Sequence, residues 1–155
     1  METARYNVLL VEDDLPSIEL ARRAVAESFP QVDLTVVGGG DAVLDWLNSN
    51  VAGNKQMPHI ILLDLKLPKL DGLAVLRTLR KHDAIMRDIP IVVFSAEYIQ
   101  ADVLMSYQVG ANSFVTKPTD LAQFTEFFHE QLAYWLQSRQ RRLTIASAQS
   151  GAEAV

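Results

Sequence analysis

Residues 60–63, Ile-Ile-Leu-Leu, form an uninterrupted apolar run that ends at Asp64. A strand that is apolar on both faces must be covered on both, which is typical of strands inside parallel sheets. Four further runs have the character of strands, at 6–11, 31–37, 91–94 and 113–116. The segments between these runs carry apolar residues at helical spacing, at 15–28, 41–48, 72–81 and 99–109. This alternation predicts an α/β fold with a five-stranded, parallel, doubly wound sheet and helices on both faces.

The segments between the predicted elements contain turn and cap signals. Residues 38–40 are three glycines without the spacing of a dinucleotide-binding loop, so we interpret them as a turn. Residues 48–58 are polar and 82–89 are predicted to be a loop. Gly110 should end a helix, and Thr119 is predicted to be the N-cap of the last helix.

Composition excludes several classes of site. The chain has 155 residues with 49% hydrophobic residues, which predicts one folded domain, at 1–138, followed by a flexible tail at 139–155. Because there is no cysteine, disulfides and cysteine-based metal sites are excluded. The net charge of −5 argues against nucleic acid as a partner. No segment resembles a signal peptide or a membrane span, so we expect a cytoplasmic protein.

Polar side chains follow four of the five predicted strands. Glu12, Asp13 and Asp14 come after the first strand, and Asp64 comes after the third. Ser95 follows the fourth strand and Lys117 the fifth. In a parallel sheet these positions lie on one rim, the rim where doubly wound sheets bind their ligands.

The crowding of carboxylates on this rim points to a hard cation. Neighbouring carboxylates repel each other unless a cation neutralises them, and Mg²⁺ prefers carboxylates, waters and phosphate oxygens. Zinc is disfavoured because no His or Cys lies in these segments. Asp64 would then be an attacking carboxylate that forms an aspartyl phosphate, with Lys117 holding the added negative charge. Asp14 is predicted to cap the first helix.

Four segments together resemble the receiver domain of two-component response regulators. They are Leu9-Leu10-Val11-Glu12-Asp13-Asp14, Ile61-Leu62-Leu63-Asp64-Leu65-Lys66-Leu67-Pro68 with Asp71-Gly72, Phe94-Ser95-Ala96, and Phe114-Val115-Thr116-Lys117-Pro118. Their order and spacing match over residues 5–135. The resemblance implies a flavodoxin-like (βα)5 fold. The amino-acid sequence around Asp64 and at Tyr134-Trp135-Leu136 is similar to that of the stand-alone regulators that partner bacterial phytochromes.

The resemblance also implies a role for each site residue. Asp64 would accept a phosphoryl group from the phosphohistidine of a sensor histidine kinase, in the presence of Mg²⁺. The metal ligands implied are Asp13 directly, Glu12 through water, Asp64, and the backbone carbonyl of Lys66.

The remaining implied roles concern the switch. Ser95 would hydrogen-bond the phosphoryl group, Lys117 would pair with it, and the Lys117–Pro118 peptide bond would be cis. Phe114 would be the aromatic residue that moves with Ser95. Many relatives have Tyr at that position, and Phe114 cannot donate a hydrogen bond.

Two alternative functions compete with the phosphoacceptor. A haloacid dehalogenase-type phosphatase also uses an Asp nucleophile and Mg²⁺, but it needs a second Asp two residues further on, where this chain has Lys66. The other alternative is a receiver fold that serves only as a docking scaffold, which does not depend on phosphorylation. We expect no enzymatic activity beyond slow self-catalysed phosphoryl transfer and dephosphorylation.

The last predicted helix carries more aromatic residues than one sheet face should cover. They are Phe124, Phe127, Phe128, Tyr134 and Trp135. An apolar face left over after core packing predicts an interaction surface, and we expect a homodimer through this helix. Output would pass to an unknown downstream protein through such contacts.

Overall fold

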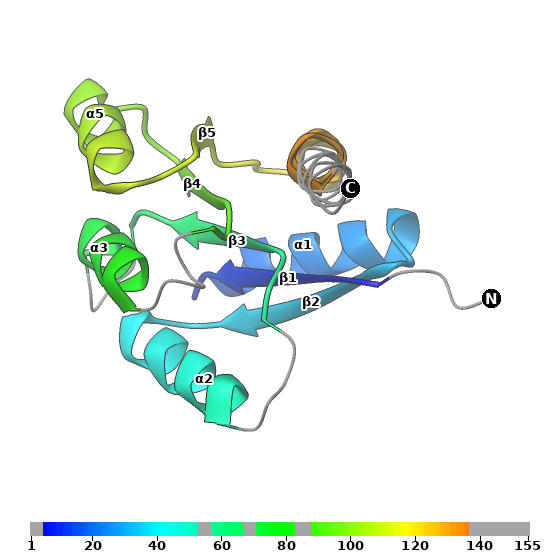
Figure 1. The fold of residues 1–155 in the computed structure, drawn as a ribbon. Helices are drawn as coiled ribbons and strands as arrows, with labels where there is room; N and C mark the ends of the chain where they lie inside the picture. The colour runs from blue at the N-terminus through cyan, green and yellow to red at the C-terminus, as the bar shows by residue number, and fades with distance from the viewer. Residues whose placement is uncertain (1–4, 53–56, 67–70, 83–87, 137–155) are drawn as a thin grey trace, which may run out of the picture.

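The computed structural model of the protein describes residues 5–52, 57–66, 71–82 and 88–136 (Figure 1). The strands are β1 (Tyr6–Val11), β2 (Val32–Val37), β3 (Ile60–Asp64), β4 (Ile91–Ser95) and β5 (Ser113–Thr116). The helices are α1 (Leu15–Ser28), α2 (Gly40–Ala52), α3 (Gly72–His82) and α5 (Gln100–Val109). A further helix at 121–136, called the C-terminal helix below, follows β5.

The five strands form one parallel sheet in the order β2-β1-β3-β4-β5. The predicted parallel, doubly wound sheet is therefore confirmed. The chain moves outward from β1 to β2 and then returns to β3 on the other side of β1. The strand order therefore reverses between β1 and β3, and their C-terminal ends, at Val11 and Leu63, are paired.

The sheet separates two hydrophobic cores. One core packs α2 and α3 against one face through residues such as Leu47, Leu76 and Ile61. The other packs α1 and the C-terminal helix against the opposite face through residues such as Ala24 and Phe128. Figure 1 shows the C-terminal helix, in orange, on the same side as α1. Alternate residues of each central strand point into different cores, which explains their uninterrupted apolar character.

Helix α2 is longer than predicted. It runs to Ala52, so residues 48–52, which we expected to begin a polar connection, are helical. Two of these residues have tertiary surroundings there. Asn48 Oδ1 lies 2.9 Å from His82 Nε2 at the end of α3, and Asn50 is buried. Tertiary contacts thus outweigh the low helix propensity of Asn.

Two predictions about the C-terminal helix are wrong. Asp120, not Thr119, is its N-cap, because Asp120 Oδ1 accepts a hydrogen bond of 2.8 Å from the amide of Gln123. The apolar face left over after core packing is smaller than predicted, because Phe127 does not belong to it. Phe124, Phe127 and Phe128 are all buried in the core shared with α1.

Residues 137–155 lie outside the described residues, so the boundary between domain and tail remains a prediction. Within the described ranges, no helix is both long enough and apolar enough to cross a membrane.

The start of α3 depends on the absence of a side chain at Gly72. Its amide donates to the carbonyl oxygen of Leu65 at 3.2 Å, and an added Cβ would lie 2.5 Å from that oxygen.

We expect Gly72→Ala to lower the free energy of unfolding by about 1–3 kcal/mol, because backbone atoms would have to move. Urea unfolding measures this change. Gly39→Ala is the control, since nothing lies within 4 Å of its Cβ position, and equal stability of the two variants would contradict the prediction.

Candidate functional site

Most of the predicted site residues meet in a surface pocket at the C-terminal ends of β1, β3 and β5. The pocket is lined by Glu12, Asp13, Asp14, Leu15, Pro16, Asp64, Lys66, Ala96 and Lys117. Glu12 and Asp64 are nearly inaccessible, with relative exposures of 1% and 3%. Parallel pairing of β1 with β3 brings these two carboxylates together, as expected for the switch point of a doubly wound sheet.

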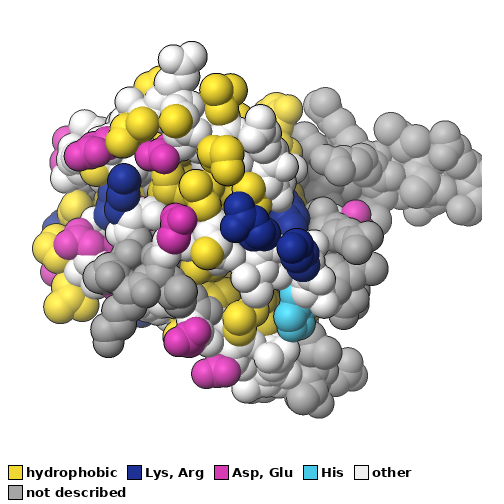
Figure 2. Space-filling model, turned by 90° about the vertical axis from the view of Figure 1, so that its left-hand side faces the viewer, with side chains coloured by type: hydrophobic (Ala, Val, Ile, Leu, Met, Phe, Trp, Pro, Cys, Tyr) yellow, Lys and Arg dark blue, Asp and Glu magenta, His cyan; other side chains and the backbone are white. Residues whose placement is uncertain are grey.

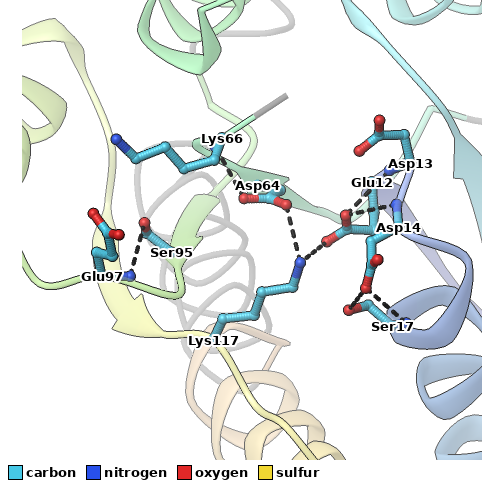
Figure 3. Close-up of polar contacts among 9 residues, drawn as sticks. All are labelled: Glu12, Asp13, Asp14, Ser17, Asp64, Lys66, Ser95, Glu97 and Lys117. Carbon is cyan, nitrogen blue, oxygen red and sulfur yellow. Dashed lines mark hydrogen bonds and ion pairs between the residues drawn. The ribbon is translucent and has the colours of Figure 1, made fainter. Parts of the chain in front are cut away.

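Lys117 holds the two buried carboxylates together (Figure 3). Its ammonium Nζ lies 2.8 Å from Glu12 Oε2 and 3.1 Å from Asp64 Oδ2. The lysine reaches this position because its amide donates to the carbonyl oxygen of Ser95 at 2.8 Å, which continues the pairing of β5 with β4. Without this cation two negative charges would be buried side by side.

These contacts change the protonation of both partners. Burial raises the pKa of Glu12 to about 7, although hydrogen bonds from Lys117 and from the Asp14 amide work in the opposite direction. Burial alone would lower the pKa of Lys117, but the carboxylates of Glu12 and Asp64 more than offset that effect and raise it above its ordinary value. The lysine therefore stays charged at neutral pH, whereas Glu12 titrates near neutrality.

The remaining atoms of the acidic segment are held by local hydrogen bonds. Glu12 Oε1 accepts from the amides of Asp13 and Asp14 at 3.1 and 3.0 Å. Asp14 Oδ2 accepts from the amide and hydroxyl of Ser17, which confirms Asp14 as the N-cap of α1. The bond from the Ser17 hydroxyl also lowers the pKa of the Asp14 carboxyl.

The Asp64 carboxylate is fixed through both oxygens. Oδ1 accepts from the amide of Lys66 at 3.0 Å, and Oδ2 faces Lys117. Because the side chain ends in the open pocket, a small phosphate-bearing molecule can approach it while the strand behind it stays buried. The geometry suits a nucleophile that is held in place and has a cation beside it.

Two predicted switch residues lie away from the pocket lining. The hydroxyl of Ser95 is buried and accepts a long bond of 3.4 Å from the amide of Glu97, on the side of Asp64 opposite Glu12 (Figure 3). Phe114 is half-buried against the core of α2 and α3, and its ring meets that of Tyr98 edge-on with centroids 6.0 Å apart. Its amide donates to the hydroxyl of Tyr107 at 3.2 Å.

The donor set fits a hard divalent cation, but the side chains do not yet converge on one. Within the described ranges, no three His, Cys, Asp or Glu side chains come close enough together to hold a metal ion. Figure 3 shows the Asp13 carboxylate apart from the Asp64 carboxylate, with no contact between them, and Lys117 Nζ between Glu12 and Asp64. The pocket nevertheless supplies carboxylate oxygens, which are the donors that Mg²⁺ prefers, together with the ammonium groups of Lys66 and Lys117.

One implied feature is wrong. The Lys117–Pro118 peptide bond is trans, as are all peptide bonds of the described residues. Trans is the intrinsically preferred isomer even before proline, and it already brings Lys117 Nζ within 3.1 Å of Asp64.

Sequence reasoning missed a partner of the site. Lys66 Nζ lies 3.8 Å from Asp102 Oδ2 in the first turn of α5. No motif marks Asp102, since an acidic residue near a helix start is common for reasons of the helix dipole alone.

The raised pKa of Glu12 predicts a pH-dependent stability. Between the ordinary value of 4.5 and about 7, the folded protein binds more protons at Glu12 than the unfolded chain, so stability falls as pH rises through this window. Glu12→Gln removes this titration. We expect the variant to gain about 1–3 kcal/mol relative to wild type between pH 5 and pH 8. Urea unfolding in EDTA tests this, with exposed Glu130→Gln as control, and parallel pH profiles of Glu12→Gln and wild type would contradict it.

Comparison with known proteins agrees with this geometry. The family model for the response regulator receiver domain matches residues 8–129. The probable methanogenesis regulatory protein FilR2 of Methanothrix harundinacea is 32% identical over 131 residues, which is 84% of each chain. Response regulator Rcp1 of Synechocystis sp. is 30% identical over 132 residues, covering 84% of this chain and 89% of that protein.

Solved structures show the same fold. The Mn²⁺-bound form of Rcp1 superposes with a TM-score of 0.72, covering 84% of this chain and 94% of that chain. The phosphorylated cyanobacterial phytochrome response regulator RcpA superposes with a TM-score of 0.77 at 32% identity, covering 87% of this chain and 96% of that chain. Since the match spans all five strands and the strand ends that build the pocket, the chain belongs to the response regulator receiver domain family.

Proposed function

We propose that this receiver domain accepts a phosphoryl group on Asp64 from a sensor histidine kinase, in a reaction that needs Mg²⁺. The observation that carries the proposal is the state of Asp64. Its carboxylate is buried at the end of β3, fixed by the Lys66 amide, and paired with Lys117 at 3.1 Å on the floor of an open pocket. The likeness to RcpA, a phytochrome response regulator, supports a phytochrome kinase as the phosphoryl donor.

The proposed chemistry is a simple transfer. A carboxylate oxygen of Asp64 attacks the phosphorus of the kinase phosphohistidine, and the P–N bond breaks with its electron pair moving to the imidazole nitrogen. The nitrogen is protonated, and Asp64 becomes an acyl phosphate. Lys117 can keep its position during the transfer, because its ammonium group already lies beside Asp64 Oδ2, next to the site where the phosphoryl group would be added.

The proposed metal donors are Glu12, Asp13, Asp64 and the backbone carbonyl of Lys66. Bound Mg²⁺ would neutralise charge on the phosphoryl oxygens during transfer. The Mn²⁺-bound structure of the relative Rcp1 supports the binding of a divalent cation by this receiver domain. For Asp13 to take part, its carboxylate has to come closer to Asp64 than it lies in Figure 3.

Phosphorylation would be read out through α5 and its surroundings. Phosphorylation replaces one negative charge with about −1.5 to −2 charges. The Ser95 hydroxyl, which has only a long bond to Glu97, would turn to donate to the new oxygens. Phe114 would then move with it, and its contact with Tyr98 would pass the change to the segment that precedes α5. We propose that output runs through protein contacts on this surface rather than through enzymatic turnover.

The phosphatase alternative has no support at the site. Its acid/base position is occupied by Lys66, whose ammonium points away from Asp64 and pairs with Asp102.

Asp64→Asn should abolish uptake of a phosphoryl group, because an amide oxygen is too weak a nucleophile to form the acyl phosphate. Wild-type protein incubated with acetyl phosphate and Mg²⁺ should show the added mass of one phosphoryl group by intact mass spectrometry. Asp45→Asn, an exposed carboxylate on α2, serves as the matched control and should label like wild type. Labelling of Asp64→Asn would disprove the assignment.

Mg²⁺ should raise the thermal unfolding midpoint of the wild type, since a ligand that binds only the folded state stabilises it by about 2.7 kcal/mol at a hundredfold excess over its Kd. Asp13→Asn should lose most of that increase, because one proposed ligand is gone. Asp45→Asn should keep it. A wild-type midpoint that does not respond to Mg²⁺ would instead favour a receiver that serves only for docking.

A homodimer through the C-terminal helix remains a proposal with a smaller surface than the sequence indicated. Among the described residues of this helix, only Tyr134 is a largely exposed large hydrophobic side chain. If the dimer forms there, Tyr134→Glu should shift sedimentation at tens of micromolar (roughly the range where weak interfaces populate) from dimer to monomer, while Tyr98→Glu near α5 should not. A monomeric wild type with and without a phosphoryl mimic would exclude the dimer.

A further inference from the structure

Helix α5 buries fewer of its side chains than α1 or α3. Of its ten residues only Ser106 is buried, while Leu104, Met105 and Tyr107 are exposed, Leu104 to 57%. Figure 2 shows hydrophobic side chains gathered at the top of the face that carries α5, above a group of Lys and Arg side chains. Because so little of α5 is buried, the hydrogen bonds and ion pairs at its two ends matter for its position.

The C-terminal end of α5 is held by a dense set of hydrogen bonds. Arg80 of α3 donates to the carbonyl oxygen of Gly110 at 2.8 Å and to Asn112 Oδ1 at 2.6 Å. Asn112 also exchanges two bonds with Ile91 of β4, at 2.8 and 2.9 Å. A third bond joins Arg80 to the carbonyl oxygen of Ile89 at 2.8 Å. This end of the helix is therefore tied to α3 and to the sheet.

The N-terminal end is held much more weakly. Ile99 occupies the N-cap position and provides no side-chain hydrogen bond. The charged contact at this end is the ion pair between Asp102 and Lys66, which is 3.8 Å long and partly exposed. Exposed pairs of this length add little stability, so another anion can displace the carboxylate.

Lys66 belongs to the phosphoacceptor pocket as well as to this ion pair. Its amide donates to Asp64 Oδ1 at 3.0 Å, and its side chain lines the pocket. Figure 3 shows this side chain directed away from the Asp64 carboxylate, on the side of Ser95. The same lysine thus stands between the group that gains negative charge and the loosely held end of α5.

We propose that α5 is a lever that is fixed at its C-terminal end by Arg80 and Asn112 and released at its N-terminal end by phosphorylation. The added negative charge on Asp64 attracts the Lys66 ammonium, which leaves Asp102. The first turn of α5 then moves while Gly110 and Asn112 stay in place. This inference rests on the proposed function, because it requires Asp64 to gain charge.

Amide hydrogen exchange measured by NMR tests the lever, with beryllium fluoride and Mg²⁺ as the phosphoryl mimic. The amide of Val103 donates to the carbonyl oxygen of Ile99 and reports on the first turn. The amide of Ala111 donates to the carbonyl oxygen of Ser106 and reports on the fixed end. In wild type we expect the mimic to speed exchange at Val103 about two- to fivefold, in line with the loss of an exposed ion pair, and to leave Ala111 unchanged.

Substitution of Asp102 separates the lever from other effects. Asp102→Asn has no ion pair to lose, so the mimic should change exchange at Val103 by less than about 1.5-fold. The response, not the basal rate, is diagnostic, because Asp102 also interacts with the helix dipole. Asp102→Glu keeps the charge and should keep the response. Glu27→Gln is the matched control, since Glu27 forms an ion pair of the same 3.8 Å length with Arg23 on α1.

Each result has a definite meaning. A full response at Val103 in Asp102→Asn, equal exchange changes at Val103 and Ala111 in wild type, or no response in a wild type that is shown to bind the mimic would overturn the lever. Intact-mass labelling with acetyl phosphate is read in parallel. Failure of Asp64 to label would overturn the proposed function, whereas labelling without a response at Val103 would overturn the lever alone.

Discussion

The ion pairs of Lys117 with Glu12 and Asp64 are the interaction on which the site depends. They allow two carboxylates to be buried side by side at neighbouring strand ends, an arrangement that would be costly without a cation. They also connect β5, at one edge of the sheet, with β1 and β3 at its centre. The same cation lies 3.1 Å from the Asp64 carboxylate, beside the position that a phosphoryl oxygen would take in the proposed transfer. The burial of the two carboxylates and the proposed phosphoryl transfer therefore depend on the same lysine.

Most of the fold and the membership of the site could be predicted from sequence, for identifiable reasons. The apolar runs that end at Val11 and Asp64 mark buried parallel strands, and a parallel sheet brings the strand-end residues Glu12 and Lys117 to one rim. Asp14 was predictable as a cap because an N-cap is a local interaction. The N-cap of the C-terminal helix was harder to predict, because Thr119 and Asp120 are adjacent and both can cap a helix. The choice of Asp120 depends on the residue at which the backbone becomes helical.

What sequence could not give is the direction and the burial of individual side chains. The helical spacing of Phe124, Phe127 and Phe128 shows an apolar helix but not how wide a face its neighbours cover, and α1 and the sheet together cover all three. Asn48 and Asn50 have the composition of a loop and become helical through their tertiary surroundings. The pairing of Lys66 with Asp102 joins two segments that no motif relates. All of these depend on long-range packing, which periodicity does not record.

The two cores on opposite faces of the sheet have a consequence for spectroscopy. Trp46 of α2 packs against the core shared with α3, and Trp135 of the C-terminal helix packs against the core shared with α1. These are the two tryptophans of the chain. A variant that retains one tryptophan therefore reports on a single face of the sheet. The fluorescence of two such variants followed during refolding would show whether the two faces assemble in one step or in succession.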